Sequence, residues 1–252
     1  MAESVAKQES DPRRKIDAAV VAAPATRQHR AMAFQTYVVL ASLVFVGIAF
    51  LAHTSPYFPI DLTFTRAVQG IHSPVFDRIM YVISWIGFVP QVDILGAIVI
   101  LLLYLTGLRW EAVGAIFAAC GVGVGLLVKL IVFRPRPSAD LVHVFSQVPA
   151  SGFPSGHVLM CTAFIGFLTF LGYTLLKTSW VRTLLLVAFA FLIVLMGLSR
   201  IYLGHHWFSD VMGAYLLGSL WLALTIRFYR WGKTRYFVRQ PVAPAAPGPP
   251  GS

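Results

Sequence analysis

Long apolar runs, separated by short polar segments, form the main pattern of this chain. The runs cover residues 36–52, 90–106, 112–132, 155–175, 181–198 and 207–228. Each run has about 17–22 residues, and a helix needs about 20 apolar residues to cross the hydrocarbon core of a bilayer. The pattern therefore predicts an all-α integral membrane protein with six transmembrane helices in a bundle.

The segment 76–86 has a different pattern. Its apolar residues repeat at the spacing of one helix face: Ile79, Val82, Ile83 and Ile86. Asp77 and Arg78 lie near its start. A short amphipathic segment of this kind is typical of a helix at the membrane surface. We expect it to border the entrance for a lipid headgroup, and the alternative is a helix that only packs against the bundle.

The composition agrees with a membrane protein. Hydrophobic residues make up 58% of the 252 residues and charged residues 12%, and the mean hydropathy is +0.75. Average soluble proteins have roughly 45–50% and 25%, respectively. The net charge of +10 would suit a nucleic-acid partner, but many basic residues flank the apolar runs. Basic residues in such places orient membrane spans, so we expect the bilayer as partner and no nucleic acid.

The distribution of lysine and arginine predicts the topology. With both termini in the cytoplasm, the inner segments carry most of the basic residues outside the motifs described below, as the positive-inside rule requires. We expect a disordered cytoplasmic tail over 1–34, a six-span domain over 35–230, and a tail over 231–252 that is first basic and then rich in Pro and Ala. The first apolar run begins too late and is too long for a cleaved export signal.

The first polar motif, KLIVFRPRP, covers residues 129–137 at the end of the third apolar run. An unpaired ammonium inside an apolar helix is costly, so Lys129 needs an anion or must extend its side chain to the membrane surface. The two prolines end the helix and hold Arg136 in an extended segment. The motif alone is compatible with an anion site and with ordinary loop arginines.

The second motif, PSGH at residues 154–157, begins the fourth apolar run. Proline suits the start of a helix. The first N–H groups of a helix have no partner within it and bind anions. Ser155 and Gly156 therefore predict a phosphate contact, with His157 beside it, and the alternative is a plain helix start.

The third motif, SRIYLGHHWFSD, covers residues 199–210. If the following run is helical, His206 and Asp210 lie one turn apart on one face, whereas His205 lies off that face. A carboxylate on one imidazole nitrogen leaves the other free to attack. Arg200 adds a planar cation that suits phosphate. The alternative is a histidine that caps a helix start.

The predicted topology places all three motifs at the outer membrane face, where together they predict a phosphate site. Lys129-x6-Arg136-Pro137, Pro154-Ser155-Gly156-His157 and Ser199-Arg200-x5-His206-x3-Asp210 resemble the three-part signature of the type-2 phosphatidic acid phosphatase family, which is similar at the site to vanadium haloperoxidases. All eleven fixed positions are present in order. Arg134 and His205 are further polar residues beside the motifs, without a role in that family signature.

The resemblance implies a mechanism. His206 attacks phosphorus and forms a phosphohistidine, Asp210 orients it, and His157 is the general acid and base. The phosphate oxygens are held by a second group: Lys129, Arg136, Ser155, Gly156 and Arg200. We expect no cofactor and no metal, because the site lacks an Asp/Glu cluster for magnesium, and Cys120 and Cys161 lack the spacing of a metal site.

We therefore expect a phosphatase of a membrane lipid in a bacterial inner membrane, with its site facing outward. The candidate substrates are undecaprenyl diphosphate and phosphatidic acid or phosphatidylglycerophosphate. The alternatives are a lipid phosphotransferase, a lipid A phosphatase with the same site, and a transporter or binding protein for anionic lipids. The sequence alone predicts neither the substrate nor the oligomeric state.

Overall fold

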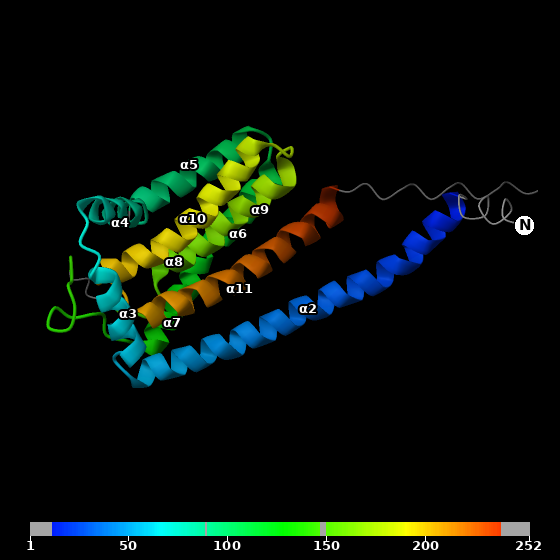
Figure 1. Cartoon of the computed structure of the whole chain (residues 1–252). Helices are drawn as coiled ribbons and strands as arrows, with labels where there is room; N and C mark the ends of the chain where they lie inside the picture. The colour runs from blue at the N-terminus through cyan, green and yellow to red at the C-terminus, as the bar shows by residue number, and fades with distance from the viewer. Residues whose placement is uncertain (1–11, 89, 147–149, 238–252) are drawn as a thin grey trace, which may run out of the picture. The chain divides into compact units, whose positions relative to one another are not determined.

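The computed structural model describes residues 12–88, 90–146 and 150–237. Within these residues all regular structure is helical, which confirms the predicted all-α class. The helices in Figure 1 are α2 (Pro12–Thr54), α3 (Pro59–Gln69), α4 (Pro74–Ile86), α5 (Gln91–Leu105), α6 (Arg109–Ala119), α7 (Gly121–Val132), α8 (Gly156–Met160), α9 (Gly166–Leu175), α10 (Trp180–Tyr202) and α11 (Phe208–Gly232). Two π-helical turns, η1 (Cys161–Ile165) and η2 (Lys233–Phe237), continue α8 and α11.

The chain divides into two units, the first ending at Gly47 and the second starting at Ile48. In the first unit, α2 begins at Pro12 and therefore includes residues 12–34, where the sequence analysis expects a disordered tail. The structure differs there because the segment is rich in alanine, the residue with the highest helix propensity. Residues 231–237 are likewise helical. The remaining parts of both expected tails, 1–11 and 238–252, lie outside the described residues.

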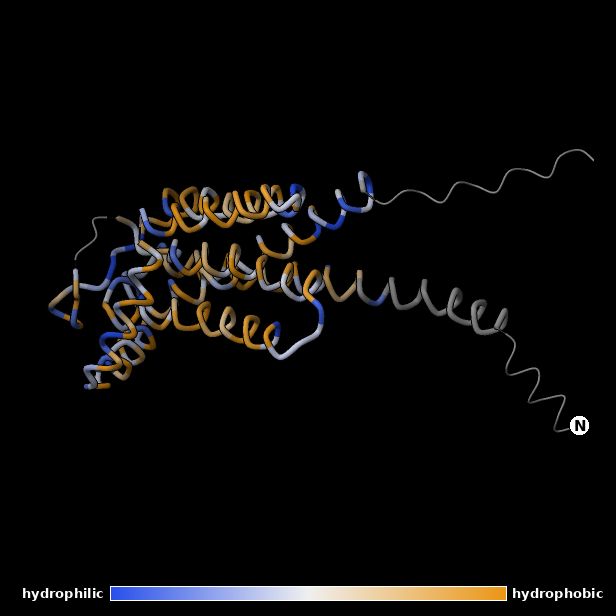
Figure 2. Tube along the Cα trace, turned by 90° about the horizontal axis from the view of Figure 1, so that it is seen from above, coloured by the Kyte–Doolittle hydropathy of each residue, from blue (hydrophilic) through white to orange (hydrophobic). Residues whose placement is uncertain are grey.

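Five helical segments in the described part of the chain are long and apolar enough to cross a membrane. They are Ala31–Thr54, Arg109–Val132, Gly156–Leu175, Trp180–Tyr202 and Phe208–Tyr236. Helices α4 and α5 meet at a 60° bend, and they are long and apolar enough to cross a membrane only when taken together. Figure 2 shows apolar residues along most of these helices. Leu130, Phe133 and Trp180 are more than three-quarters exposed, as expected of side chains that face lipid.

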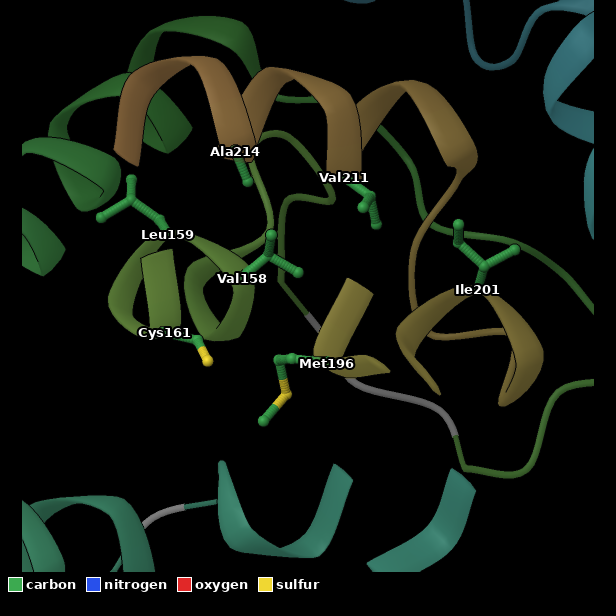
Figure 3. Close-up of a cluster of buried hydrophobic side chains, with 7 residues drawn as sticks. All are labelled: Val158, Leu159, Cys161, Met196, Ile201, Val211 and Ala214. Carbon is green, nitrogen blue, oxygen red and sulfur yellow. The ribbon is translucent and has the colours of Figure 1, made fainter. Parts of the chain in front are cut away.

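A buried apolar cluster joins the parts of α8, η1, α10 and α11 that lie next to the second and third motifs (Figure 3). Its members are Val158, Leu159, Cys161, Met196, Ile201, Val211 and Ala214. Glycines of α11 allow neighbouring segments to approach closely, as small residues do between membrane helices. A Cβ on Gly213 would lie 2.4 Å from the ring of Phe153, and one on Gly218 would lie 2.8 Å from Thr162. The packing therefore fixes the helix ends that carry the motifs.

Helix α4 is the short helix expected from the amphipathic segment. Ser73 caps its start by accepting a hydrogen bond from Phe76 N, and Pro74 follows at the first helical position, where its missing N–H costs nothing. Two side chains of α4 bind the end of α10: Ser84 accepts a hydrogen bond from Arg200, and Asp77 accepts one from Tyr202. Its position at the membrane surface stays a prediction.

The contact between Gly213 and Phe153 yields a test of the packing. Gly213→Ala should lower the free energy of unfolding by about 1–3 kcal/mol, because an added methyl group overfills a tight contact. Gly123→Ala is the matched control, because a Cβ there has nothing within 4 Å. The measurement is the melting midpoint of both purified variants in one detergent. Equal midpoints would contradict the packing described.

Candidate functional site

The structure places the three sequence motifs at neighbouring helix ends. Lys129 lies in the last turn of α7, Ser155 precedes α8, Arg200 lies in the last turn of α10, and Asp210 lies in the first turn of α11. Gly156 and His157 begin α8, His206 lies between α10 and α11, and Arg136 follows α7. All eight predicted site residues are therefore within the described chain.

Hydrogen bonds connect the first motif to the loop before α8. Lys129 Nζ donates to Ser151 O at 2.7 Å. Arg136 Nε donates to Ala150 O at 2.9 Å, and its Nη1 donates to His205 O at 3.0 Å. Lys129, predicted to need an anion, thus contacts a carbonyl oxygen in this structure. Arg136 ties the first motif to the third.

Backbone contacts also join the second motif to the third. Ser155 N donates to Asp210 O at 3.3 Å. A Cβ on Gly152 would lie 3.0 Å from Asp210 Oδ2, so a glycine there lets the loop pass close to the carboxylate. The peptide between Gly152 and Ser155 therefore runs directly beside the start of α11.

His206 and Asp210 form a buried pair at the center of the site. His206 Nδ1 lies 3.6 Å from Asp210 Oδ2, and the two side chains are 1% and 0% exposed. The same Oδ2 accepts a hydrogen bond from Trp207 N at 3.0 Å. His206 Nε2 is then the ring nitrogen that does not face the carboxylate. His205 has another partner, Ser146 Oγ, at 2.9 Å from its Nε2.

The electrostatic environment holds His206 neutral. Burial lowers the pKa of the His206 imidazole well below its usual range, and the nearby cations Arg136, Arg200 and Lys129 lower it further. A neutral imidazole has the free electron pair that a nucleophile needs. The same cations provide the positive charge that a bound phosphate would neutralise.

Several buried polar atoms have no hydrogen-bond partner within the described residues. They include Ser155 Oγ, His157 Nε2, Arg200 Nε and His206 Nδ1. A buried polar atom without a partner costs about 1–3 kcal/mol, and such atoms gather where a protein binds a polar ligand. Three of the eight predicted site residues, Ser155, His157 and Arg200, thus have an atom available to a ligand, whereas His206 Nδ1 faces Asp210.

Phe88, between α4 and α5, is a residue of the site that the motifs do not reveal. Its ring centroid lies 5.3 Å from that of His157 and 6.1 Å from that of His205, and 5.2 Å from Arg200 Cζ. Gly87 makes this approach possible, because a Cβ there would lie 2.6 Å from the His157 ring. Phe88 therefore covers the histidines and stacks on a phosphate-binding candidate.

Arg134 is a second residue without a predicted role, and it is almost fully buried. Its Nη1 donates to Asp210 Oδ1 at 2.7 Å, and its Nη2 donates to Asp61 Oδ2 at 2.8 Å. Asp61, in α3, lies 73 residues earlier in the chain. The position of Arg134 inside the first motif indicated that it could belong to the site. No feature of the sequence predicts its pairing with Asp61.

An apolar cavity of about 520 Å³ opens next to the site. Its wall includes Gly156 and His157. Apart from Asp93 in α5, the rest of the lining is apolar and comes from several helices, with Val99, Phe164 and Met196 among its residues. The described residues contain no cluster of three or more His, Cys, Asp or Glu that could hold a metal ion.

Comparison with known proteins agrees with this geometry. A model of the PAP2 superfamily matches residues 108–233, half of the chain, and this range includes all three motifs. Undecaprenyl-diphosphatase BcrC of Bacillus subtilis (strain 168) is 31% identical over 171 residues, which cover 65% of this chain and 78% of that protein.

Two solved structures share the fold. The transmembrane PAP2 type phosphatidylglycerolphosphate phosphatase of Bacillus subtilis has a TM-score of 0.68 at 24% identity, covering 80% of this chain and 98% of that one. Aquifex aeolicus LpxE has a TM-score of 0.55 at 20% identity, covering 68% and 96%. The resemblance seen in the motifs is confirmed, and the chain belongs to the PAP2 superfamily.

Proposed function

We propose that this protein is a membrane lipid phosphatase that hydrolyses a phosphomonoester or a diphosphate through a phosphohistidine. The observation that carries the proposal is the buried pair of His206 and Asp210, with 3.6 Å between Nδ1 and Oδ2, among three cations. A neutral histidine with an orienting carboxylate suits nucleophilic attack, and the cations suit the charge of a phosphoryl group.

In the first step, His206 Nε2 forms a bond to phosphorus and the bond to the leaving oxygen breaks. His157 donates a proton to that oxygen, so that the lipid leaves as an alcohol or a monophosphate. His206 becomes positively charged, and Asp210 stabilises this charge. Arg136, Lys129 and Arg200 bind the phosphoryl oxygens, together with Ser155 Oγ and the amide of Gly156.

In the second step, water attacks the phosphohistidine. His157, now neutral, accepts a proton from this water, the bond between nitrogen and phosphorus breaks, and phosphate leaves. His206 returns to its starting form. General acid and base catalysis of this kind contributes roughly 10²–10⁴-fold, and the cations supply further stabilisation where charge develops.

The apolar cavity supports a lipid as substrate. A cavity of about 520 Å³ that reaches His157 offers space for part of an acyl or isoprenoid chain while the phosphate contacts the polar residues. The relationship to an undecaprenyl-diphosphatase makes a polyprenyl diphosphate the first candidate. Phosphatidic acid and phosphatidylglycerophosphate are the next candidates.

We further propose six spans, of which the bent α4–α5 pair contributes one, with both termini in the cytoplasm. The site then faces outward from a bacterial inner membrane. The motif-bearing ends of α7, α8, α10 and α11 support this arrangement, because six alternating spans place all four of them on the side opposite the termini. The positive-inside rule agrees with it.

Replacing the nucleophile tests the proposed reaction. His206→Ala should lower kcat by about 10³-fold or more, as loss of an attacking group does in other enzymes. The assay measures phosphate release from farnesyl diphosphate and dioctanoyl phosphatidic acid in detergent, without an acceptor. His205→Gln is the control and should keep kcat within about tenfold. Full activity of His206→Ala would contradict the mechanism.

Metal removal is a separate test. Because Lys129, Arg136 and Arg200 supply the positive charge that a magnesium ion supplies in many phosphatases, EDTA should change kcat by less than about twofold. The same phosphate-release assay is run with EDTA, and then with added Mg²⁺. Loss of activity in EDTA, with recovery in Mg²⁺, would overturn metal-independent turnover.

The lipid cavity is tested by filling it. Gly96 lines the cavity, and a Cβ there has nothing within 4 Å. Gly96→Leu should raise KM for dipalmitoyl phosphatidic acid by about fivefold or more, because each buried methylene contributes about 0.8 kcal/mol, and should change KM for glycerol 3-phosphate little. Gly123→Leu, outside the cavity lining, is the control. Equal effects on both substrates would contradict a site for the lipid chain.

A further inference from the structure

Two buried residues outside the proposed phosphate site form ion pairs around Asp210. Arg134 pairs with Asp210 at 2.7 Å and with Asp61 at 2.8 Å, and all three side chains are fully buried. They come from three places in the chain: the segment after α7, the start of α11 and the first turn of α3. Such a cluster is costly to bury unless each charge is paired and hydrogen-bonded.

The hydrogen bonds satisfy nearly every polar atom of the cluster. Arg134 Nη1 also donates to Ser209 Oγ at 2.7 Å, and its Nε donates to Ser55 O at 3.3 Å. Asp61 Oδ1 accepts from Ser209 N at 2.7 Å, and its Oδ2 accepts from Ser209 Oγ at 2.9 Å. Asp61 therefore holds the first turn of α11, and Arg134 holds Oδ1 of Asp210.

The geometry leaves one oxygen of Asp210 for His206. Because Oδ1 is bound by Arg134 and Oδ2 lies 3.6 Å from His206 Nδ1, rotation of the carboxylate away from the imidazole would break the contact with Arg134. Arg134 therefore orients Asp210, and Asp210 orients His206, the proposed nucleophile.

The charges in the cluster matter as much as its shape. Two carboxylates and one guanidinium leave one net negative charge beside His206. An Asp210 paired with Arg134 alone would be neutralised and would stabilise a positively charged His206 poorly. Two carboxylates without Arg134 would repel each other, and one would bind a proton. Only the complete set keeps a single negative charge there without a proton.

We propose that Asp61 and Arg134 are positioning residues of the phosphoryl-transfer reaction, which act by fixing the orientation and the net charge of Asp210. The proposal rests on the proposed function, because the charge that Asp210 stabilises develops on His206 as phosphorus is attacked. The effect belongs to the transition state and the phosphohistidine, so it changes kcat and leaves substrate binding nearly unaltered.

A double-mutant cycle separates this role from a merely structural one. Asp61→Asn removes the net negative charge, Arg134→Gln leaves two carboxylates that repel each other and compete for a proton, and the double variant Asp61→Asn/Arg134→Gln leaves the single negative charge of Asp210. The probes are farnesyl diphosphate and dioctanoyl phosphatidic acid, with purified full-length protein in detergent. Each single variant should lower kcat by about tenfold or more with KM within about threefold, and the double variant should have a higher kcat than either.

Two further variants keep the test decisive if a single variant folds poorly. Ser209→Ala removes two hydrogen bonds of the cluster and no charge, so its kcat should fall less than that of Asp61→Asn. Arg134→Lys keeps the charge and should retain a higher kcat than Arg134→Gln. Melting midpoints of all variants identify losses that are due to unfolding.

The outcomes distinguish the two proposals. If the double variant has a kcat no higher than that of either single variant, or Ser209→Ala is as inactive as Asp61→Asn, the cluster is only structural and the inference is wrong. If the unaltered protein releases no phosphate from either probe, or His206→Ala is fully active, the proposed function itself fails.

Discussion

The requirement that most constrains this protein is to keep a carboxylate charged where no water reaches it. Asp210 is fully buried beside His206, and an isolated buried carboxylate would bind a proton. Arg134 opposes this tendency by pairing with it at 2.7 Å. Asp61 pairs with the other Nη of Arg134 at 2.8 Å and gives the cluster its net negative charge. The short helix α3, which carries Asp61, thereby becomes part of the site although it belongs to no motif.

The site lies at the ends of apolar helices, and this location provides both polar groups and rigidity. The interior of a membrane bundle has little polar material to bind a phosphate, and a site entirely in loops would lack rigidity. Helix ends provide unpaired N–H groups and allow charged side chains near water. The buried cluster around Val158, Met196 and Val211 holds those helix ends together. Rigid apolar packing and the hydrogen bonds between the motifs together position the polar groups.

Much of the site could be predicted from the sequence, because its residues lie in three short motifs with fixed spacing. The pair His206 and Asp210 was predicted from their spacing of four residues, and the structure brings the two side chains to 3.6 Å, although His206 lies before the first turn of α11 and not in the helix. Asp61 could not be predicted, because nothing in a single sequence connects it to Arg134, 73 residues away. Phe88 was missed for the same reason, since it reaches the histidines through a bend between two helices.

The fold was predictable in its class and less so in its details. Apolar runs of suitable length identify helices reliably because the bilayer leaves few alternatives. The run at 90–106 forms the shorter helix α5, which is long enough to cross a membrane only together with α4. The expected tail before residue 35 is helical from Pro12, because alanine favours a helix even without an apolar stripe to pack.

The shared wall of the apolar cavity and the polar site has a consequence for the products of the proposed reaction. His157 faces both environments, so the bond that breaks lies at the boundary between them. The dephosphorylated lipid dissolves in the membrane and the inorganic phosphate dissolves in water. The two products therefore separate into different phases, and the reverse reaction would need a phosphate and a lipid to meet again at the same boundary.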